Sequence, residues 1–550
     1  MAKHTMLRLA ACCLSAAVAS AWSQAAPDRP GTDAGKSASS SLTGKVVSQT
    51  AGNALKKTNL LLRPTGAGKT LSAESDDQGA FSFPTVEPGR FTLTGERAGY
   101  ARQAYGARGN SSTGAVLTLT AGHEMKDLVF RLAPNAVLSG KVRDEDGDPM
   151  ASTVVMALRL AYQHGRKQYA EAGSTLVGAN GEYSISVTAG HYLLAAVSMG
   201  GMMAGLQGSS GKPATDAPES TYATVFYPRS PDETGAVAVD AAAGADLRGM
   251  DFYMAKVKAF RVRGKLSEPP AGKTTLAALN PLGSAVAPAL TPKIVRVQPD
   301  GSFEFTGVTP GPWLLRAMGD AVASVSLQVV TVEDKHVAGL VVAVGPMGEL
   351  SGAVTVEGKD AVSPKGIQVT LEGAEAGKTG GQAQAGEDGR FTVKNLLPDR
   401  YQVRISNAPA GVWLKSVRYG NQDVTDAGAD LTGGVSGSLE VLVNPNGAEI
   451  DGVVADADGK PMPGATVALI PDSRRALLFQ SDATDQSGAF CFQGVPPGDY
   501  KLLAWEDVVS GAWYDPEFLK LVEGKAQAVT VKENDRKSVT LNAIPMEAKR

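Results

Sequence analysis

The sequence predicts an all-β protein built as a tandem array of five β-sandwich domains that is elongated along its length. Its 550 residues exceed what one hydrophobic core usually supports, so several domains are expected. Glycine (63) and proline (31) are abundant and only 20% of residues are charged, which is typical of many short strands joined by turns. A turn-and-strand motif also recurs five times, which indicates five copies of one structural unit.

The N-terminal residues have the pattern of a secretory signal peptide, predicted over residues 1–25. Lys3 and Arg8 precede a small apolar run at residues 9–18, and small residues follow at cleavage-like spacing. Cys12 leaves lipidation open as an alternative to ordinary cleavage. Residues 26–40 are rich in Pro, Gly and Ser and predict a flexible linker. No later apolar stretch is long enough to span a membrane, so we expect an exported chain that is periplasmic, held at the cell surface or secreted.

Each copy of the motif combines a tight turn with a strand of alternating apolar and polar residues. Asp-Gly or Asn-Gly supplies the positive φ of the turn, and a Pro-Gly-type turn then leads into a strand that begins with an inward aromatic residue. The first turn and strand recur at residues 77–83, 179–185, 299–305, 387–393 and 486–492. The second turn recurs at residues 88–91, 189–192, 310–313, 398–401 and 497–500. The motif therefore predicts a hairpin in every unit.

An opening strand before each hairpin and a closing strand after it set the limits of the units. We call the predicted domains units one to five: 41–133, 136–256 (with a loop insertion at 199–220), 259–345, 347–444 and 447–545. Units of about 100 residues with many short strands have the size of a two-sheet sandwich. The joints between units are only a few residues long, which favours a semi-rigid rod of about 170 Å.

The order Gly-Lys-Val, Asp-x-x-Gly-x-Phe-x-Phe and Pro-Gly-x-Tyr resembles the carboxypeptidase regulatory-like domain. The resemblance covers residues 41 to about 545 and is clearest in units one, two and five. It implies a transthyretin-like Greek-key sandwich, grouped with carbohydrate-binding-like folds. The whole chain also resembles multi-domain bacterial envelope proteins that carry these domains. The resemblance implies a fold and an exported location, and it supplies no reaction.

Catalytic, cofactor-binding and metal sites are not predicted. After signal cleavage the chain has only four histidines, His123, His164, His191 and His336, and they lack close His–His or His–Glu spacing for a metal. No acid/base or nucleophile constellation converges on one unit, so we expect no enzyme activity.

Five aromatic residues in units four and five are candidate ligand-binding residues. Exposed aromatic rings can stack on sugars, and the candidates are Trp505, Trp513 and Tyr514, followed by Trp413 and Tyr419. The alternative is that these rings cover the hydrophobic core. The sequence Asp515-Pro516-Glu517 additionally predicts an N-cap and a short helix that would fix Trp513 near a sheet edge.

Cys491 is the one cysteine left after signal cleavage. It occupies an outward-facing position of its strand, so an exposed thiol is expected. The thiol is either a partly covered surface cysteine or a group for intermolecular pairing outside the cell.

The preferred hypothesis is an exported, non-enzymatic scaffold or binding rod of β-sandwich domains at the cell envelope. The alternative is a carbohydrate-binding protein that uses the aromatics of units four and five. The partner is an unknown protein or polysaccharide. Nucleic acid is excluded as the main partner because the formal net charge is −3.

Overall fold

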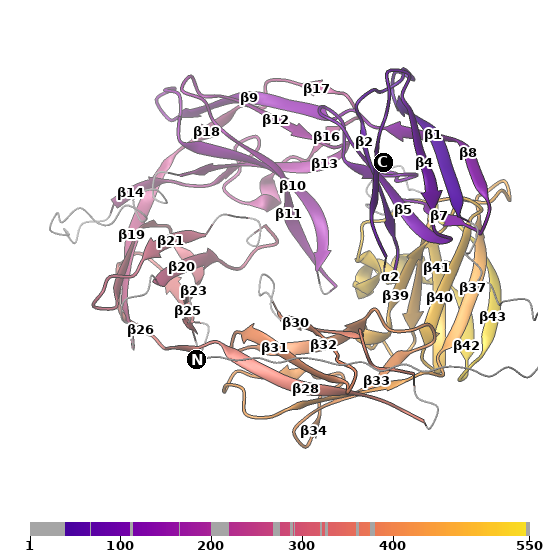
Figure 1. The fold of residues 1–550 in the computed structure, drawn as a ribbon. Helices are drawn as coiled ribbons and strands as arrows, with labels where there is room; N and C mark the ends of the chain where they lie inside the picture. Colours follow the sequence, from indigo (N-terminus) through magenta and orange to yellow (C-terminus); the bar gives the residue numbers. More distant parts are fainter. Residues whose placement is uncertain are drawn as a thin grey trace, which may run out of the picture.

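The computed structural model places most of the chain in strands (Figure 1). It describes residues 39–66, 68–109, 114–163, 165–199, 219–267, 275–286, 290, 292–319, 322–324, 328–358, 362–373 and 380–545. The predicted signal peptide, most of the linker and residues 200–218 of the predicted insertion lie outside these residues. Within the described part the chain forms ten sheets, and the predicted all-β class is confirmed. The exact limits of the five units stay predictions.

Unit one places one three-stranded sheet, β4-β1-β8, over a second sheet, β3-β2-β5-β6, with β7 also paired to β5. Its strands are β1 Ser40–Ser48, β2 Asn59–Pro64, β3 Leu71–Glu74, β4 Ala80–Val86, β5 Gly89–Glu96, β6 Gln103–Ala104, β7 Val116–Leu119 and β8 Glu124–Leu132. Strand β1 begins within the predicted linker, at its last residue. The core lies between the two sheets and includes Leu60, Leu93 and Phe130.

Unit two pairs the sheet β12-β9-β17, with β18 also on β9, against β11-β10-β13-β15, with β16 also on β13. The strands are β9 Ala136–Asp144, β10 Thr153–Gln163, β11 Arg166–Leu176, β12 Glu182–Val187, β13 Gly190–Ser198, β15 Val225–Phe226, β16 Val239–Ala241, β17 Asp246–Leu247 and β18 Phe252–Met254, with a 3-10 helix η1 at Glu233–Gly235. Strands β10 and β11 form a long hairpin that extends beyond the sandwich (Figure 1).

Unit three is joined to unit two by a strand that crosses between them. Strand β14 (Glu219–Tyr222) begins within the last two residues of the predicted insertion of unit two and pairs with β19 of unit three. The other strands are β19 Lys256–Leu266, β20 Thr275–Pro281, β21 Lys293–Arg296, β22 Ser302–Val308, β23 Gly311–Gly319, β24 Val322–Ser324, β25 Gln328–Val332, β26 Val337–Val342 and β27 Val344–Pro346. Arg261 on β19 forms ion pairs with Glu219 and with Glu304 on β22, which ties β14 to the sheet.

Units four and five repeat the two-sheet arrangement, with sheets β31-β28-β36-β33-β34 and β30-β29-β32-β35 in unit four and β40-β37-β43 and β39-β38-β41-β42 in unit five. Unit four contains β28 Gly348–Val356, β29 Gln368–Gly373, β30 Gln382–Gln384, β31 Arg390–Leu396, β32 Arg400–Ser406, β33 Trp413–Tyr419, β34 Gln422–Asp423, β35 Ala429–Asp430 and β36 Leu439–Asn444. Unit five contains β37 Ala448–Ala455, β38 Thr466–Pro471, η3 Ala476–Leu478, β39 Gln480–Ala483, β40 Ala489–Val495, β41 Gly498–Trp505, η4 Ala512–Tyr514, α2 Pro516–Val522, η5 Glu523–Lys525, β42 Gln527–Val531 and β43 Arg536–Asn542.

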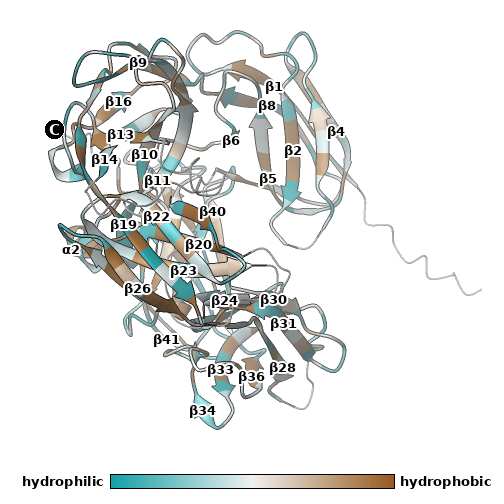
Figure 2. Cartoon of the chain, turned by 90° about the vertical axis from the view of Figure 1, so that its left-hand side faces the viewer, coloured by the Kyte–Doolittle hydropathy of each residue, from teal (hydrophilic) through white to brown (hydrophobic). Residues whose placement is uncertain are grey.

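The predicted tight turns are present in every unit, but the predicted hairpins are not. The strands before and after each turn, such as β3 and β4 or β39 and β40, lie in different sheets, so the turn carries the chain from one sheet of the sandwich to the other. The turn glycines Gly79, Gly181, Gly301, Gly389 and Gly488 all have φ between 74° and 83°. In unit five the carboxylate of Asp485 accepts hydrogen bonds from the backbone N–H groups of Ser487 and Ala489. Hydrophobic and hydrophilic residues then alternate along the following strands, with the hydrophobic ones buried (Figure 2).

The inward aromatic after the second turn is fixed by a hydrogen bond in four units. The hydroxyl groups of Tyr192, Tyr401 and Tyr500 donate to the carbonyl oxygen four residues upstream, at 2.7, 2.8 and 2.8 Å. In unit three the indole N–H of Trp313 donates to the Thr309 carbonyl oxygen at 3.1 Å. Unit one has Phe91 at this place, which makes no such bond. Burial also raises the pKa of Tyr401 and of Tyr500 to about 12.

The predicted elongated shape is wrong, because the five units follow a closed circuit in which unit five returns to unit one (Figure 1). Ion pairs join Arg90 to Asp482 at 2.8 Å and Arg108 to Glu506 at 3.3 Å. Short joints limit tumbling between neighbours, but they do not set the direction in which the chain continues. That direction is set by side contacts, such as the crossing of β14, and the repeat motif does not encode them.

Candidate functional site

The aromatic candidates of unit five form a second hydrophobic core instead of an exposed platform. Trp505 at the end of β41 is 3% exposed and Trp513 in η4 is 5% exposed, so the expectation of exposed stacking surfaces is wrong for both. Their rings stack with centroids 6.3 Å apart. The cluster lies against the β38–β41 pair, and it includes Ile470, Leu503 and Leu519.

The short helix that the sequence predicted is present as α2, and it covers this second core. Asp515 is the N-cap, its carboxylate accepts a hydrogen bond from Glu517 N at 2.9 Å, and Pro516 is the first helical residue. Tyr514 is half-buried, stacks on Phe479 with centroids 4.7 Å apart, and burial raises the pKa of its phenol. The aromatic side chains of this segment are therefore used for packing.

The aromatic candidates of unit four are half-buried on β33. Trp413 lies beside a cavity of about 300 Å³ at the joint with unit five, which Phe479 and Arg475 also line. The hydroxyl oxygen of Tyr419 accepts hydrogen bonds from Ser436 N and Gly437 N, at 2.9 and 3.1 Å. The structure thus does not bring these two rings together with Trp505 and Trp513 on one surface.

Cys491 lies on β40 next to the contact between units one and five. Its thiol is half-buried, and its backbone N–H donates to the Asp482 carboxylate at 3.0 Å. Burial raises the pKa of the thiol, as do the carboxylates of Glu449 and Asp482, while Arg90 opposes them. The thiol is therefore less exposed than strand alternation predicted, and it is held in its neutral form.

The contact between units one and five is centred on one side chain that completes a sheet edge. The Gln486 amide accepts a hydrogen bond from Thr118 N at 3.0 Å and donates one to Thr118 O at 3.1 Å. These are the bonds that a neighbouring strand would make to β7. The hydroxyl of Thr118 also donates to the Asp485 carboxylate at 2.9 Å. The turn of unit five therefore caps the free edge of β7, which protects it from pairing with other chains.

Hydrogen bonds keep Asp485 ionised at this contact. Burial alone would raise its pKa, but hydrogen bonds from Ser487, Ala489 and Thr118 hold the pKa below its usual range. The sequence motif placed Gln486 in a turn and predicted no contact with unit one, and Asp485 lies just before the residues assigned to that motif. A turn that caps its own strand and a turn that also caps a distant strand have the same sequence pattern.

The long hairpin of unit two contacts unit five as well. Tyr162 near the end of β10 packs against Phe518 of α2, with ring centroids 6.4 Å apart. A Cβ atom at Gly165 would lie 2.8 Å from the Tyr514 carbonyl oxygen, so the hairpin tip approaches η4 closely. Unit five is thus held by units one, two and four.

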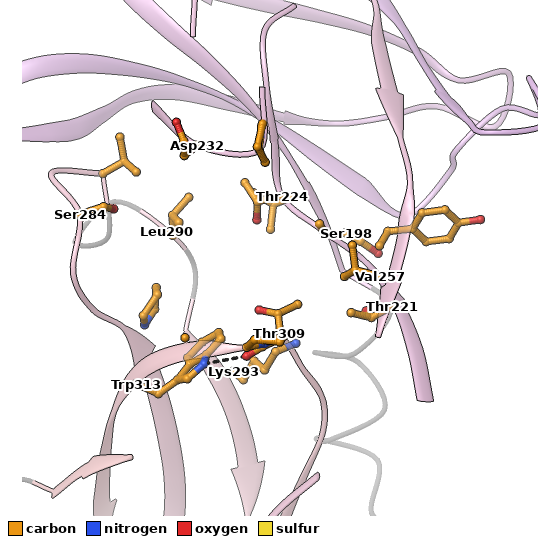
Figure 3. Close-up of a pocket in the computed structure, with 18 of the residues that line it drawn as sticks. Ser198, Thr221, Thr224, Asp232, Val257, Ser284, Leu290, Lys293, Thr309 and Trp313 are labelled. Carbon is orange, nitrogen blue, oxygen red and sulfur yellow. Dashed lines mark hydrogen bonds between the residues drawn. The ribbon is translucent and has the colours of Figure 1, made fainter. Parts of the chain in front are cut away.

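A cavity of about 660 Å³ lies between units two and three (Figure 3). Lys293 and Trp313 of unit three lie on one wall, and Asp232 of unit two lies on the opposite wall. Burial lowers the pKa of the Lys293 ammonium group. Nothing in the sequence pointed to this cavity, because its walls come from segments that share no motif.

No cluster of three or more metal-ligating side chains was found among the described residues. In the same part of the chain no helix is both long and apolar enough to cross a membrane.

Comparison with protein families identifies domains in three of the five units. The carboxypeptidase regulatory-like domain matches residues 41–132 and 449–542. Residues 349–424 match the second beta sandwich domain of the BOS complex subunit NOMO1-like family. Among curated proteins, none matched the chain.

Several solved structures have local similarity to the chain at 12% identity. The Bacillus anthracis TIE protein aligns over 74% of this chain and 74% of its own, with a TM-score of 0.16. A streptococcal ancillary pilin aligns over 56% of this chain and 98% of its own (TM-score 0.20), and the minor pilin GBS52 of Streptococcus agalactiae over 40% and 97% (TM-score 0.22). These TM-scores support no argument about function.

The family comparison and the sandwich topology agree for the first and last units. Residues 41–132 and 449–542 therefore match the carboxypeptidase regulatory-like domain in both sequence and sandwich topology, within a chain that is built of β-sheets throughout its described part.

Proposed function

We propose that the protein is an exported, non-enzymatic scaffold that presents β-sandwich domains at the cell envelope in a fixed arrangement. The main support is the contact between units one and five, in which Gln486 and Asp485 bind β7 and two ion pairs flank them. A closed circuit of domains holds surfaces from distant parts of the chain at set positions, which is a property that a scaffold needs.

The export part of the proposal rests on the pattern of residues 1–25. The test compares Leu14→Arg, which places a charge in the apolar run, with Ser37→Arg, which places the same charge in the linker. Both variants and the parent chain are expressed in a bacterial host and fractionated. We expect Leu14→Arg to remain in the cytoplasm with its N-terminal residues attached, and Ser37→Arg to be processed and exported. Equal export of both variants would contradict the signal peptide.

The scaffold part predicts that the purified chain has no turnover on chromogenic glycoside or peptide substrates, and that envelope proteins or polysaccharide co-purify with it after crosslinking in cells. The Gln486→Ala variant tests whether the contact between units one and five matters for partner binding. This variant should retain smaller amounts of any crosslinked partner that binds units one and five together. Turnover that is lost on substitution of one residue would contradict the non-enzymatic proposal.

The alternative of sugar binding on exposed aromatics is not favoured by the burial of Trp505 and Trp513. Trp413 is the remaining candidate, because it lines the cavity between units four and five. Polysaccharide binding that Trp413→Ala abolishes without unfolding the chain would support this alternative over the scaffold.

A further inference from the structure

The cavity between units two and three has the size and composition of a small-molecule site. Its volume of about 660 Å³ is within the range of roughly 300 to 1,000 Å³ that such sites occupy. Both units contribute walls: Thr221, Thr224 and Asp232 come from unit two, and Lys293 and Trp313 come from unit three. The cavity exists because the two units are docked, and the ion pair between Arg261 of unit three and Glu219 of β14 contributes to that docking.

Lys293 is the charged group of this cavity that is left for a ligand. Its side chain is partly buried on β21, and within the described part of the chain its ammonium group makes no hydrogen bond or ion pair. Placing a charge away from water without a partner costs free energy, and a bound anion would offset this cost.

The two acidic residues of the cavity are already engaged by the protein. One carboxylate oxygen of Asp232 accepts hydrogen bonds from Thr234 N and Gly235 N as the cap of η1. A Glu233 oxygen accepts a hydrogen bond from Ala285 N at 3.1 Å, which links η1 to unit three. Figure 3 shows Asp232 on the wall opposite Lys293. The wall around Lys293 is therefore positive, and the opposite wall would repel a second negative charge.

The remaining walls match a ligand that carries hydroxyl and C–H groups. The side chains of Thr221, Thr224, Ser284 and Thr309 supply hydroxyl groups around the cavity. The indole ring of Trp313 is mostly covered by the core of unit three, with 8% of the residue exposed, and it is fixed by its hydrogen bond to Thr309 O. The part of the ring that lines the cavity can contact C–H groups of a ligand.

We propose that this cavity binds a small organic carboxylate that carries several hydroxyl groups, with Lys293 pairing to the carboxylate and Trp313 packing on its carbon skeleton. Two lysines line the cavity, but Lys258 is exposed and only Lys293 is partly buried. One partly buried ammonium group matches a monoanion better than a phosphate, which is usually held by several donors at once. The proposal goes beyond the scaffold function and does not depend on export.

The test is isothermal titration calorimetry of the full chain without its predicted signal peptide, with D-glucuronate as the probe. Methyl β-D-glucopyranoside has the same ring without the charge, acetate has the charge without the hydroxyl groups, and inorganic phosphate is a different anion. We expect saturable binding of glucuronate, and affinities at least tenfold weaker for the other three. No saturable binding of glucuronate, or tighter binding of phosphate, would overturn the proposal.

Variants then test the assigned residue. Lys293→Gln should weaken glucuronate binding at least tenfold, whereas Lys265→Gln, at an exposed lysine of β19 that does not line the cavity, should leave it within about twofold. A thermal unfolding curve checks that Lys293→Gln is folded, and Thr224→Val, which keeps the charge, should weaken glucuronate but not acetate. Unchanged glucuronate binding in a folded Lys293→Gln protein would contradict the role of Lys293.

Discussion

At the scale of single residues, the aromatic side chains of this protein stabilise the fold by packing and hydrogen bonding, and their positions in the motif predict only part of these contacts. The sequence predicted the inward aromatic residue after the second turn. It did not predict the hydrogen bond from the tyrosine hydroxyl to the carbonyl oxygen four residues upstream, because Phe91 fits the same motif without a hydroxyl group. Likewise, Trp505 and Trp513 follow a strand end, where a sequence alone does not distinguish a ring that covers a core from one that binds a ligand. In the structure helix α2 packs over the two rings, so they cover a core.

We predict that Tyr500→Phe destabilises unit five by about 1 to 3 kcal/mol, because the Pro496 carbonyl oxygen loses its buried donor. Urea unfolding followed by intrinsic fluorescence measures the change. The control is Tyr253→Phe on β18, where the ring is 41% exposed and its contact with Arg229 is kept. Equal stability of Tyr500→Phe and the parent chain would contradict the structural role of the hydroxyl.

The raised tyrosine pKa values predict a loss of stability in alkali. Tyr401 and Tyr500 are held neutral in the folded chain, with pKa values of about 12, whereas an unfolded tyrosine ionises near pH 10. The unfolded state therefore binds fewer protons between these values, and the free energy of unfolding should fall as pH rises from about 10 to 12. Denaturant titrations across this range measure the fall, which should be smaller in Tyr401→Phe and Tyr500→Phe. A flat profile would contradict the assigned burial.

At the scale of strands and turns, the sequence predicts most of what the structure shows. The positive φ of Gly488, the alternation along β40 and the start of α2 at Pro516 all follow from local rules that act within a few residues. The role of the opening-strand glycines was not predicted, because it depends on strands distant in sequence. At Gly452 a Cβ atom would lie 2.2 Å from the Val539 carbonyl oxygen and 2.8 Å from the ring of Phe490.

We therefore predict that Gly452→Ala destabilises unit five by about 1 to 3 kcal/mol, the usual cost of extra atoms in a filled core. The matched control is Gly524→Ala, because no atom lies within 4 Å of the added Cβ there. Chemical unfolding of both variants gives the comparison. A Gly452→Ala protein as stable as Gly524→Ala would show that β37 can move away from β43 at no cost.

At the scale of the whole molecule, contacts between units decide the shape, and these could not be predicted from the repeats. Each unit carries the same turn, but only in unit five does a turn reach β7 of unit one through Gln486. The cavity between units two and three also depends on docking, since Lys293 and Asp232 come from different units. A repeat motif predicts the fold of each unit, but it does not predict which faces of two units contact each other.

We predict that reversing the charges of unit one opens the circuit. Arg90→Glu combined with Arg108→Glu would place like charges against Asp482 and Glu506, and adding Asp482→Arg and Glu506→Arg should restore closure. Partial proteolysis at the contact between units one and five measures opening, which we expect in the double variant and not in the fourfold variant. Cleavage patterns that are identical in all three proteins would argue against these ion pairs as closing contacts.

Small-angle X-ray scattering of the purified chain in solution tests the closed circuit most directly. Five sandwiches in line would reach about 170 Å. The closed arrangement predicts a maximum dimension far below this value, which increases in the charge-reversed double variant and returns in the fourfold variant. A maximum dimension near 170 Å for the parent chain would contradict the closure of unit five onto unit one.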